Sequence, residues 1–312
     1  MSKHSSASRI RLGTRASALA RWQAEWVADR LGELGFEVDL VPITTTGDRH
    51  REGAIGSLGE RGVFTKELQK ALLEDRIDLA VHSLKDLPTE EVPGLCLAAV
   101  PERGPVGDAF ISTRHASFDA LPSGALLGTG SLRRQAQLLH ARPDLVFDDV
   151  RGNVDTRLRK LDEGRCDALI LAEAGLVRLG LGSRVAQRLP LEVVLPAVGQ
   201  GALGLETRQD DSRVRSAVEK LDHAPTHAAV LAERSLLAAL LGGCLAPIAA
   251  WGRVEDRVLT LSARVTHPSG TEQLDAEASS SPEEAISLGR QVAESLRARG
   301  AARLIEAARQ PR

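Results

Sequence analysis

The sequence predicts an α/β protein in which two similar lobes with mostly parallel sheets precede a small α+β domain. Buried-type strands alternate with amphipathic helices, a pattern typical of parallel sheets. A strand leaves into a helix through Leu-Gly-Thr at Leu12 and again at Leu127. An Arg-x-Asp step then enters a buried strand at Arg76 and again at Arg165. Two matches in the same order favour two related lobes.

The first lobe is predicted to begin with a strand and to carry one long loop. Its strands are expected at 8–15, 37–43 and 77–82, and its helices at 17–26 and 64–75. Residues 46–62 carry glycine and charge without an apolar period, so this segment is expected to be a lid or disordered.

The second lobe repeats the pattern, after which the chain returns to the first lobe. Strands are expected at 125–129, 144–148 and 168–171, with helices at 131–139 and 154–163. A strand at 202–206 and a helix at 212–221 follow. The predicted division is therefore lobe 1 at 5–101 and 202–219, lobe 2 at 107–195, and a C-terminal domain at 224–312.

The C-terminal part changes to an α+β pattern. Strands are expected at 248–254, 258–267 and 273–278. Ser281 and Glu284 form a capping box with Pro282 at the first helical position, which predicts a final helix through Arg299.

Composition excludes several classes of protein. A net charge of −2 gives no reason to expect nucleic acid or an anionic membrane as a partner, and no run of 18 apolar residues occurs. Cys96, Cys166 and Cys244 are odd in number and form no CxxC, which argues against a disulfide framework and a zinc ribbon. His223 and His227 lack a carboxylate that would complete a metal site. We expect a cytoplasmic, metal-free monomer.

Arginines follow four of the predicted strands. Arg15, the Arg133–Arg134 pair, Arg151 and Arg178 all occupy such positions. Ligands of parallel sheets bind beyond the carboxyl ends of the strands, so a cleft between the lobes would gather these side chains. Solvated surface charge is the alternative for any one of them, but together they favour a polyanionic ligand with planar carboxylates.

Gly128-Thr-Gly-Ser-Leu-Arg133 invites a second interpretation. It follows a strand, opens a helix and precedes Asp148 by twenty residues, as in a dinucleotide fingerprint. The third glycine is replaced by Arg133, however, so binding of another anion is the better hypothesis.

Two further residues stand out as candidates for chemistry. Cys244 follows two glycines at the end of a helical run, where it is either an accessible thiol or a packed structural cysteine. Asp86 follows a buried strand and precedes Pro88. It either caps a turn or pairs with Lys85, or it serves as an ionised acid–base group in a cationic cleft.

Taken together, these stretches resemble the porphobilinogen deaminase family over nearly the whole chain. The matching segments, in family order, are LGTRASALA from Leu12, GVFTKEL from Gly62, AVHSLKDLP from Ala80, GTGSLRRQ from Gly128, RGNVDTRL from Arg151, LPAVGQGA from Leu195 and GGC from Gly242.

The resemblance implies an enzyme that joins four porphobilinogen molecules head to tail, with loss of ammonia, into linear hydroxymethylbilane for tetrapyrrole biosynthesis. It implies two lobes like those of periplasmic binding proteins, and a dipyrromethane cofactor joined to Cys244 as a thioether. Asp86 would be the catalytic residue. The other implied cofactor-binding residues are Ser83, Lys85, Thr129, Ser131, Arg133, Arg134, Arg157 and Gln200. The implied substrate-binding residues are Arg15, Ser17, Phe64, Arg151, Arg157 and Arg178.

Two positions depart from the family pattern. The loop before Phe64 keeps only Arg61 where lysines are usual, and Gly130 stands where serine is commoner. A solute-binding or sensor protein without turnover is the rival hypothesis, and it predicts an unmodified Cys244.

Overall fold

The computed structural model describes residues 9–44, 65–240 and 246–309. The chain divides into two compact units. Unit 1 consists of Met1–Glu102 and Leu203–Ala224, and unit 2 of Arg103–Ala202 and Pro225–Arg312. The chain therefore leaves unit 1 and returns to it before entering unit 2 again.

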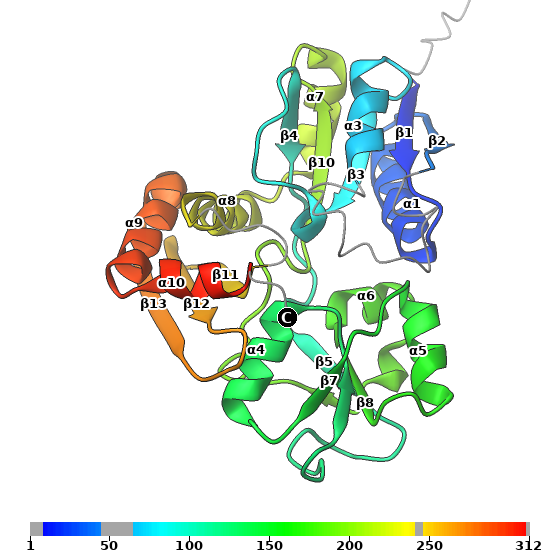
Figure 1. Ribbon diagram of the computed structural model, residues 1–312. Helices are drawn as coiled ribbons and strands as arrows, with labels where there is room; N and C mark the ends of the chain where they lie inside the picture. Colours follow the sequence, from blue (N-terminus) through cyan, green and yellow to red (C-terminus); the bar gives the residue numbers. More distant parts are fainter. Residues whose placement is uncertain (1–8, 45–64, 241–245, 310–312) are drawn as a thin grey trace, which may run out of the picture. The chain divides into compact units, whose positions relative to one another are not determined.

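Unit 1 contains a five-stranded sheet with the order β2-β1-β3-β10-β4 (Figure 1). Its strands are β1 (Ile10–Thr14), β2 (Val38–Pro42), β3 (Leu79–Ser83), β4 (Leu95–Ala99) and β10 (Leu203–Arg208). Helices α1 (Ala18–Glu33) and α7 (Ser212–Val218) share one apolar cluster with the sheet, and α3 (Lys66–Leu73) belongs to a second cluster. The sheet is thus covered by helices on both faces.

Unit 2 contains a second five-stranded sheet, with the order β7-β6-β8-β5-β9. Its strands are β5 (Asp108–Ile111), β6 (Leu126–Gly128), β7 (Val146–Asp148), β8 (Ala168–Ala172) and β9 (Gln187–Arg188). Helix α4 (Leu132–Ala141) packs into one apolar cluster, and α5 (Val154–Asp162) and α6 (Glu173–Arg178) pack into another.

The rest of unit 2 is an antiparallel three-stranded sheet with helices. Strands β11 (Ile248–Glu255), β12 (Val258–Thr266) and β13 (Gln273–Ser280) pair in that order. Helices α8 (Ala224–Ala239), α9 (Ala285–Ala298) and α10 (Ala301–Ala307) share one core with them. The predicted capping box at Ser281 and Glu284 is present. Gly300, with φ of 94°, separates α9 from α10, a helix that the sequence analysis did not predict.

The two five-stranded sheets have the same topology, which confirms the prediction of two α/β lobes. In each sheet four strands run in one direction, and the fourth strand in the order runs antiparallel to its neighbours. That antiparallel strand is β10 in unit 1 and β5 in unit 2. Each of these two strands is the first strand that the chain forms after it has crossed over from the other unit. Strand β5 was not predicted, and the three-domain boundaries stay a prediction.

A buried carboxylate ties the C-terminal sheet and its helices to the rest of unit 2. Glu233 on α8 is fully buried and accepts hydrogen bonds from the guanidinium of Arg103, at 2.6 and 3.1 Å. It also accepts from the backbone N–H groups of Gly199 and Gly252, each at 2.7 Å. Every carboxylate lone pair used here satisfies a donor that would otherwise be buried without a partner.

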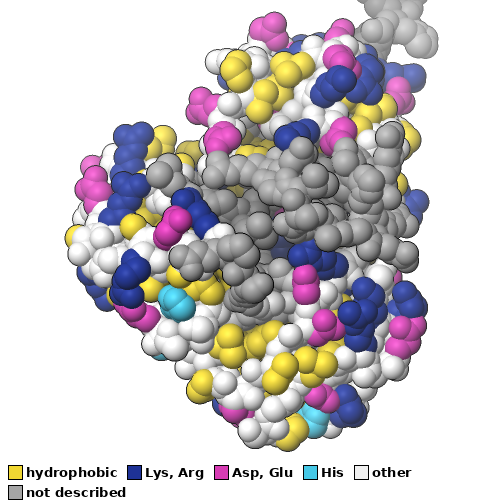
Figure 2. All heavy atoms as spheres, in the orientation of Figure 1, with side chains coloured by type: hydrophobic (Ala, Val, Ile, Leu, Met, Phe, Trp, Pro, Cys, Tyr) yellow, Lys and Arg dark blue, Asp and Glu magenta, His cyan; other side chains and the backbone are white. Residues whose placement is uncertain are grey.

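The surface carries both signs of charge. Figure 2 shows basic and acidic side chains mixed over the visible face, in agreement with the net charge of −2. Among the described residues, no helix is both long enough and apolar enough to cross a bilayer.

Candidate functional site

Asp86 lies in a short 3₁₀ helix, Leu84–Asp86, directly after the buried strand β3. Leu84 and Leu87 are buried on either side, which leaves Lys85 and Asp86 half-buried between them. Within the described part of the chain, the Asp86 carboxylate has no hydrogen-bond or ion-pair partner. The alternative in which Asp86 pairs with Lys85 is therefore not what the structure adopts.

The backbone of the neighbouring strand provides the room for this turn. Gly204 on β10 pairs with His82 of β3. A Cβ atom at Gly204 would lie 2.8 Å from Cδ1 of Leu84, so only glycine lets Leu84 settle against the sheet. Ser83, at the end of β3, accepts a hydrogen bond from Nε2 of Gln23 at 2.8 Å. These contacts fix the position of the segment that carries Asp86.

The first strand exit of unit 1 holds Arg15 and Ser17. Arg15 is half-buried. Ser17 is the N-cap of α1 and accepts a hydrogen bond from the backbone N–H of Ala20 at 3.3 Å. Its hydroxyl thus has a structural function in addition to the predicted contact with substrate.

In unit 2, Arg133 and Arg134 share one carboxylate. Nη2 of Arg133 lies 2.7 Å from Oδ2 of Asp108, and Nη2 of Arg134 lies 2.7 Å from Oδ1. Asp108 is fully buried, and each guanidinium is at least nine-tenths buried. The cluster therefore contains two cations and one anion, and it keeps one positive charge in a desolvated place.

Burial and charge act against each other in this cluster. Burial by itself raises the pKa of Asp108, but the positive charges and hydrogen bonds of Arg133 and Arg134 hold that pKa well below its usual range. Burial lowers the pKa of Arg133, Asp108 acts in the opposite direction, and Arg134 lowers it further. A second anion beside Arg133 would relieve this strain between like charges.

Gln200 joins the same network. Its Nε2 donates to Oδ1 of Asp108 at 3.0 Å and to the carbonyl of Val106 at 2.7 Å. Among the described residues, Nε of Arg133 and Oε1 of Gln200 are buried atoms without a hydrogen-bond partner. Unsatisfied buried polar atoms are rare in native proteins, and here a donor and an acceptor of one network both lack a partner among the described residues.

The other predicted residues of unit 2 surround the exits of β6, β7 and β8. Thr129 is buried, and Ser131 is the N-cap of α4 with no side-chain capping bond. Nε of Arg157 donates to the carbonyl of Gly152 at 2.7 Å. Nη2 of Arg178 donates to the carbonyl of Gly201 at 2.7 Å, and burial lowers the pKa of Arg178 to about 10.

Arg151 lies in the same region, and its guanidinium contacts Asp149 at 2.7 Å. Thr129, Ser131 and Arg151 thus come shortly after the carboxyl ends of β6 and β7, whereas Arg157 lies within α5 and Arg178 is the last residue of α6. Asp86 and these arginines belong to different units, and Cys244, Phe64 and the loop 46–62 lie outside the described residues.

Sequence reasoning missed Asp108. The residue opens a strand that was itself not predicted, so its contacts with three of the predicted residues could not be anticipated. A charged residue directly before the apolar run Ala109–Ile111 was the available signal. Charged side chains are almost never fully buried unless they are paired.

Comparison with models of protein families shows to which family the chain belongs. Residues 10–216 match the family model described as porphobilinogen deaminase, dipyromethane cofactor binding domain. Residues 227–298 match the model of the porphobilinogen deaminase C-terminal domain. The chain belongs to the porphobilinogen deaminase family.

Curated relatives agree with this. The chain is 52% identical to porphobilinogen deaminase of Desulforudis audaxviator, over 94% of this chain and 96% of the relative. It is 47% identical to porphobilinogen deaminase of Syntrophotalea carbinolica, over 97% and 96% of the two chains.

Among solved structures, a putative methionine-binding lipoprotein of Bacillus subtilis is similar at 14% identity. The match has a TM-score of 0.44 and covers 69% of this chain and 90% of that one. The methionine-binding protein MetQ matches at 14% identity with a TM-score of 0.46, over 68% and 89% of the two chains.

Proposed function

We propose that this chain catalyses the reaction of the porphobilinogen deaminase family. Four porphobilinogen molecules are joined head to tail, each loses ammonia, and linear hydroxymethylbilane is formed for tetrapyrrole biosynthesis. The observation that carries the proposal is the match of both family domains over 10–216 and 227–298. High identity over nearly the full length of the relatives supports it.

The buried cluster around Asp108 fits the dipyrromethane cofactor. That cofactor bears carboxylates. The cluster keeps one net positive charge, and Nε of Arg133 has no hydrogen-bond partner within the described part of the chain. We assign its carboxylates to Arg133 and Arg134, with Thr129, Ser131 and Gln200 as further polar contacts, and its thioether to Cys244. When bound, the dipyrromethane group supplies the pyrrole ring on which the growing chain starts.

Asp86 is the residue that we assign to proton transfer and charge stabilisation. Loss of ammonia from porphobilinogen leaves positive charge on the pyrrole, and an ionised carboxylate stabilises that charge where it develops. The same carboxylate can hold the proton of a pyrrole nitrogen. Among the described residues the Asp86 carboxylate has no partner, so it is available for both tasks, and the buried Leu84 and Leu87 hold it in one place.

The arginines at the strand exits of unit 2 are assigned to the acetate and propionate groups of the substrate. Each hydrogen bond between a guanidinium and a carboxylate contributes about 1.5–3 kcal/mol. Arg178 is suited to this role, because a carboxylate beside it would offset the burial that lowers its pKa. Arg15, Ser17, Lys85 and Phe64 are assigned to substrate or cofactor on the family pattern alone.

We further propose that the enzyme acts as a cytoplasmic monomer. Three cysteines without a CxxC suit a reducing compartment. Light scattering of the purified chain gives its oligomeric state.

Turnover tests the proposal. The purified protein, given porphobilinogen, is expected to release ammonia and to form a linear tetrapyrrole that cyclises on standing. A protein that binds porphobilinogen without releasing ammonia would instead support the solute-binding hypothesis.

A further inference from the structure

Arg151, one of the arginines assigned to substrate, is bound by a carboxylate of the chain itself. Oδ2 of Asp149 lies 2.7 Å from Nε and 2.7 Å from Nη2 of Arg151. The side chains of Arg151 and Asp149 are 41% and 49% exposed. Both partners therefore remain in contact with solvent, where an incoming anion can reach the guanidinium.

The second carboxylate oxygen of Asp149 lies against the loop between β6 and α4. A Cβ atom at Gly130 would stand 2.7 Å from Oδ1 of Asp149 and 3.7 Å from Cγ of Arg151. A side chain at this position would push Asp149 aside. Because position 130 is a glycine, the Asp149 carboxylate can occupy the space beside it.

The position of this carboxylate is informative. The Asp149 carboxylate contacts the guanidinium of Arg151 and lies beside the segment Thr129–Ser131. Both Arg151 and this segment are expected to bind the carboxylates of the ligand. The contrast with Asp108 is clear, because that carboxylate and its two arginines are buried. The pair of Asp149 and Arg151 is exposed, and such pairs are weakly held.

We propose that Asp149 competes with a carboxylate of the substrate or growing chain for Arg151, and so sets the affinity of the enzyme for porphobilinogen. The inference rests on the proposed function. In the protein without substrate, the Asp149 carboxylate is paired with the guanidinium of Arg151. When substrate binds, its acetate or propionate replaces Asp149 on the guanidinium, and the Asp149 carboxylate returns to water.

Steady-state kinetics of Asp149→Asn test the proposal. Because the variant removes a ground-state competitor, KM for porphobilinogen is expected to fall about two- to fivefold while kcat stays unchanged. Lower ionic strength should enlarge the difference between the variant and the wild type, because the competing carboxylate is exposed to screening.

Two matched controls separate competition for Arg151 from a general change of charge. Asp155→Asn removes an exposed carboxylate four residues from Arg151, and within the described residues Asp155 has no ion-pair partner. Asp144→Asn breaks a similar ion pair, in which Oδ2 of Asp144 lies 2.7 Å from Nη2 of Arg142. This pair lies before β7, whereas Asp149 and Arg151 lie after it. KM is expected to stay unchanged in both controls.

The outcomes are distinguishable. If the wild type turns over porphobilinogen and KM of Asp149→Asn is unchanged or higher, the inference is wrong and the proposed function stands. An equal fall of KM in Asp155→Asn would also overturn it, because removal of any nearby negative charge would then suffice. Absence of turnover in the wild type would overturn the proposed function and this inference with it.

Discussion

At the scale of single residues, the structure distinguishes Asp86, which the sequence singled out, from Asp108, which the sequence did not reveal. Asp108 is fully buried and bound by two arginines, so its oxygens are already used. Asp86 is half-buried and, among the described residues, has no partner. A group that must receive a proton or face a developing cation needs free lone pairs, and Asp86 has them.

Replacement of Asp86 tests its assignment. Asp86→Asn keeps the size of the side chain but removes the charge and the proton acceptor, so kcat is expected to fall at least about 100-fold. The cofactor should remain attached, which intact-mass measurement checks in the same sample. Ammonia release per enzyme gives the rate.

Glu91→Gln is the matched control for Asp86→Asn. Glu91 is an exposed acidic residue five positions further along the chain, and its replacement should leave kcat unchanged. A normal kcat in Asp86→Asn would remove Asp86 from the mechanism.

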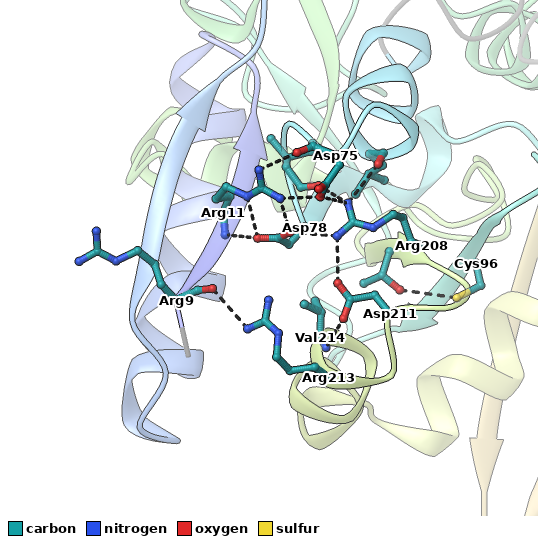
Figure 3. Close-up of polar contacts among 12 residues, drawn as sticks. Arg9, Arg11, Asp75, Asp78, Cys96, Arg208, Asp211, Arg213 and Val214 are labelled. Carbon is teal, nitrogen blue, oxygen red and sulfur yellow. Dashed lines mark hydrogen bonds and ion pairs between the residues drawn. The ribbon is translucent and has the colours of Figure 1, made fainter. Parts of the chain in front are cut away.

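At the scale of elements, an ion-pair network holds three strands of the unit 1 sheet together. Asp78, just before β3, accepts hydrogen bonds from Arg11 of β1 at 2.7 Å and from Arg208 of β10 at 3.0 Å (Figure 3). Arg208 also donates to Asp211 before α7 at 2.9 Å. Asp78 thus connects a parallel neighbour and an antiparallel neighbour of the strand that leads to Asp86.

This network makes the stability of the protein depend on pH. Burial by itself raises the pKa of Asp78, but hydrogen bonds from Arg11 and Arg208 hold that pKa well below its usual range. The unfolded chain takes up a proton at about pH 3.9, where folded Asp78 is still ionised. The stabilisation is therefore fully present above about pH 5 and is lost as the pH falls further.

Urea unfolding of Asp78→Asn measures this contribution. At pH 7 the free energy of unfolding is expected to fall by about 1–3 kcal/mol, because hydrogen bonds to a charged group are lost. Its decrease between pH 5 and pH 3 should be smaller than in the wild type. Asp39→Asn, whose partner Arg9 is exposed, should match the wild type. The same acid dependence in Asp78→Asn as in the wild type would contradict this account.

At the scale of the whole molecule, the pattern of alternating strands and helices was sufficient to predict two α/β lobes and a C-terminal α+β part. Elements α5 and β12 lie within one residue of their predicted bounds, whereas α1 continues seven residues beyond the predicted 17–26. The antiparallel strand β5 was missed because a run of only three apolar residues between loops, Ala109–Ile111, carries no period. Strand β5 is defined by its pairing with β8 and β9, and this pairing cannot be read from the local sequence.

For the candidate site, too, local positions could be predicted and contacts between distant segments could not. The arginines and Asp86 could be predicted because they follow recognisable strands. Their partners could not, because Asp108 reaches Arg133 across 25 positions and Gln200 reaches Asp108 across 92. Contacts between distant segments depend on the order of strands in the sheet, and this order is a property of the folded chain.

Intact-mass spectrometry tests most directly whether the chain carries a pyrrole primer on Cys244. Protein from a host that makes haem is expected to exceed its sequence mass by two pyrrole units. Cys96→Ser should retain this adduct, and Cys244→Ser should show the bare chain. A bare wild-type chain, or an adduct that persists in Cys244→Ser, would contradict the account.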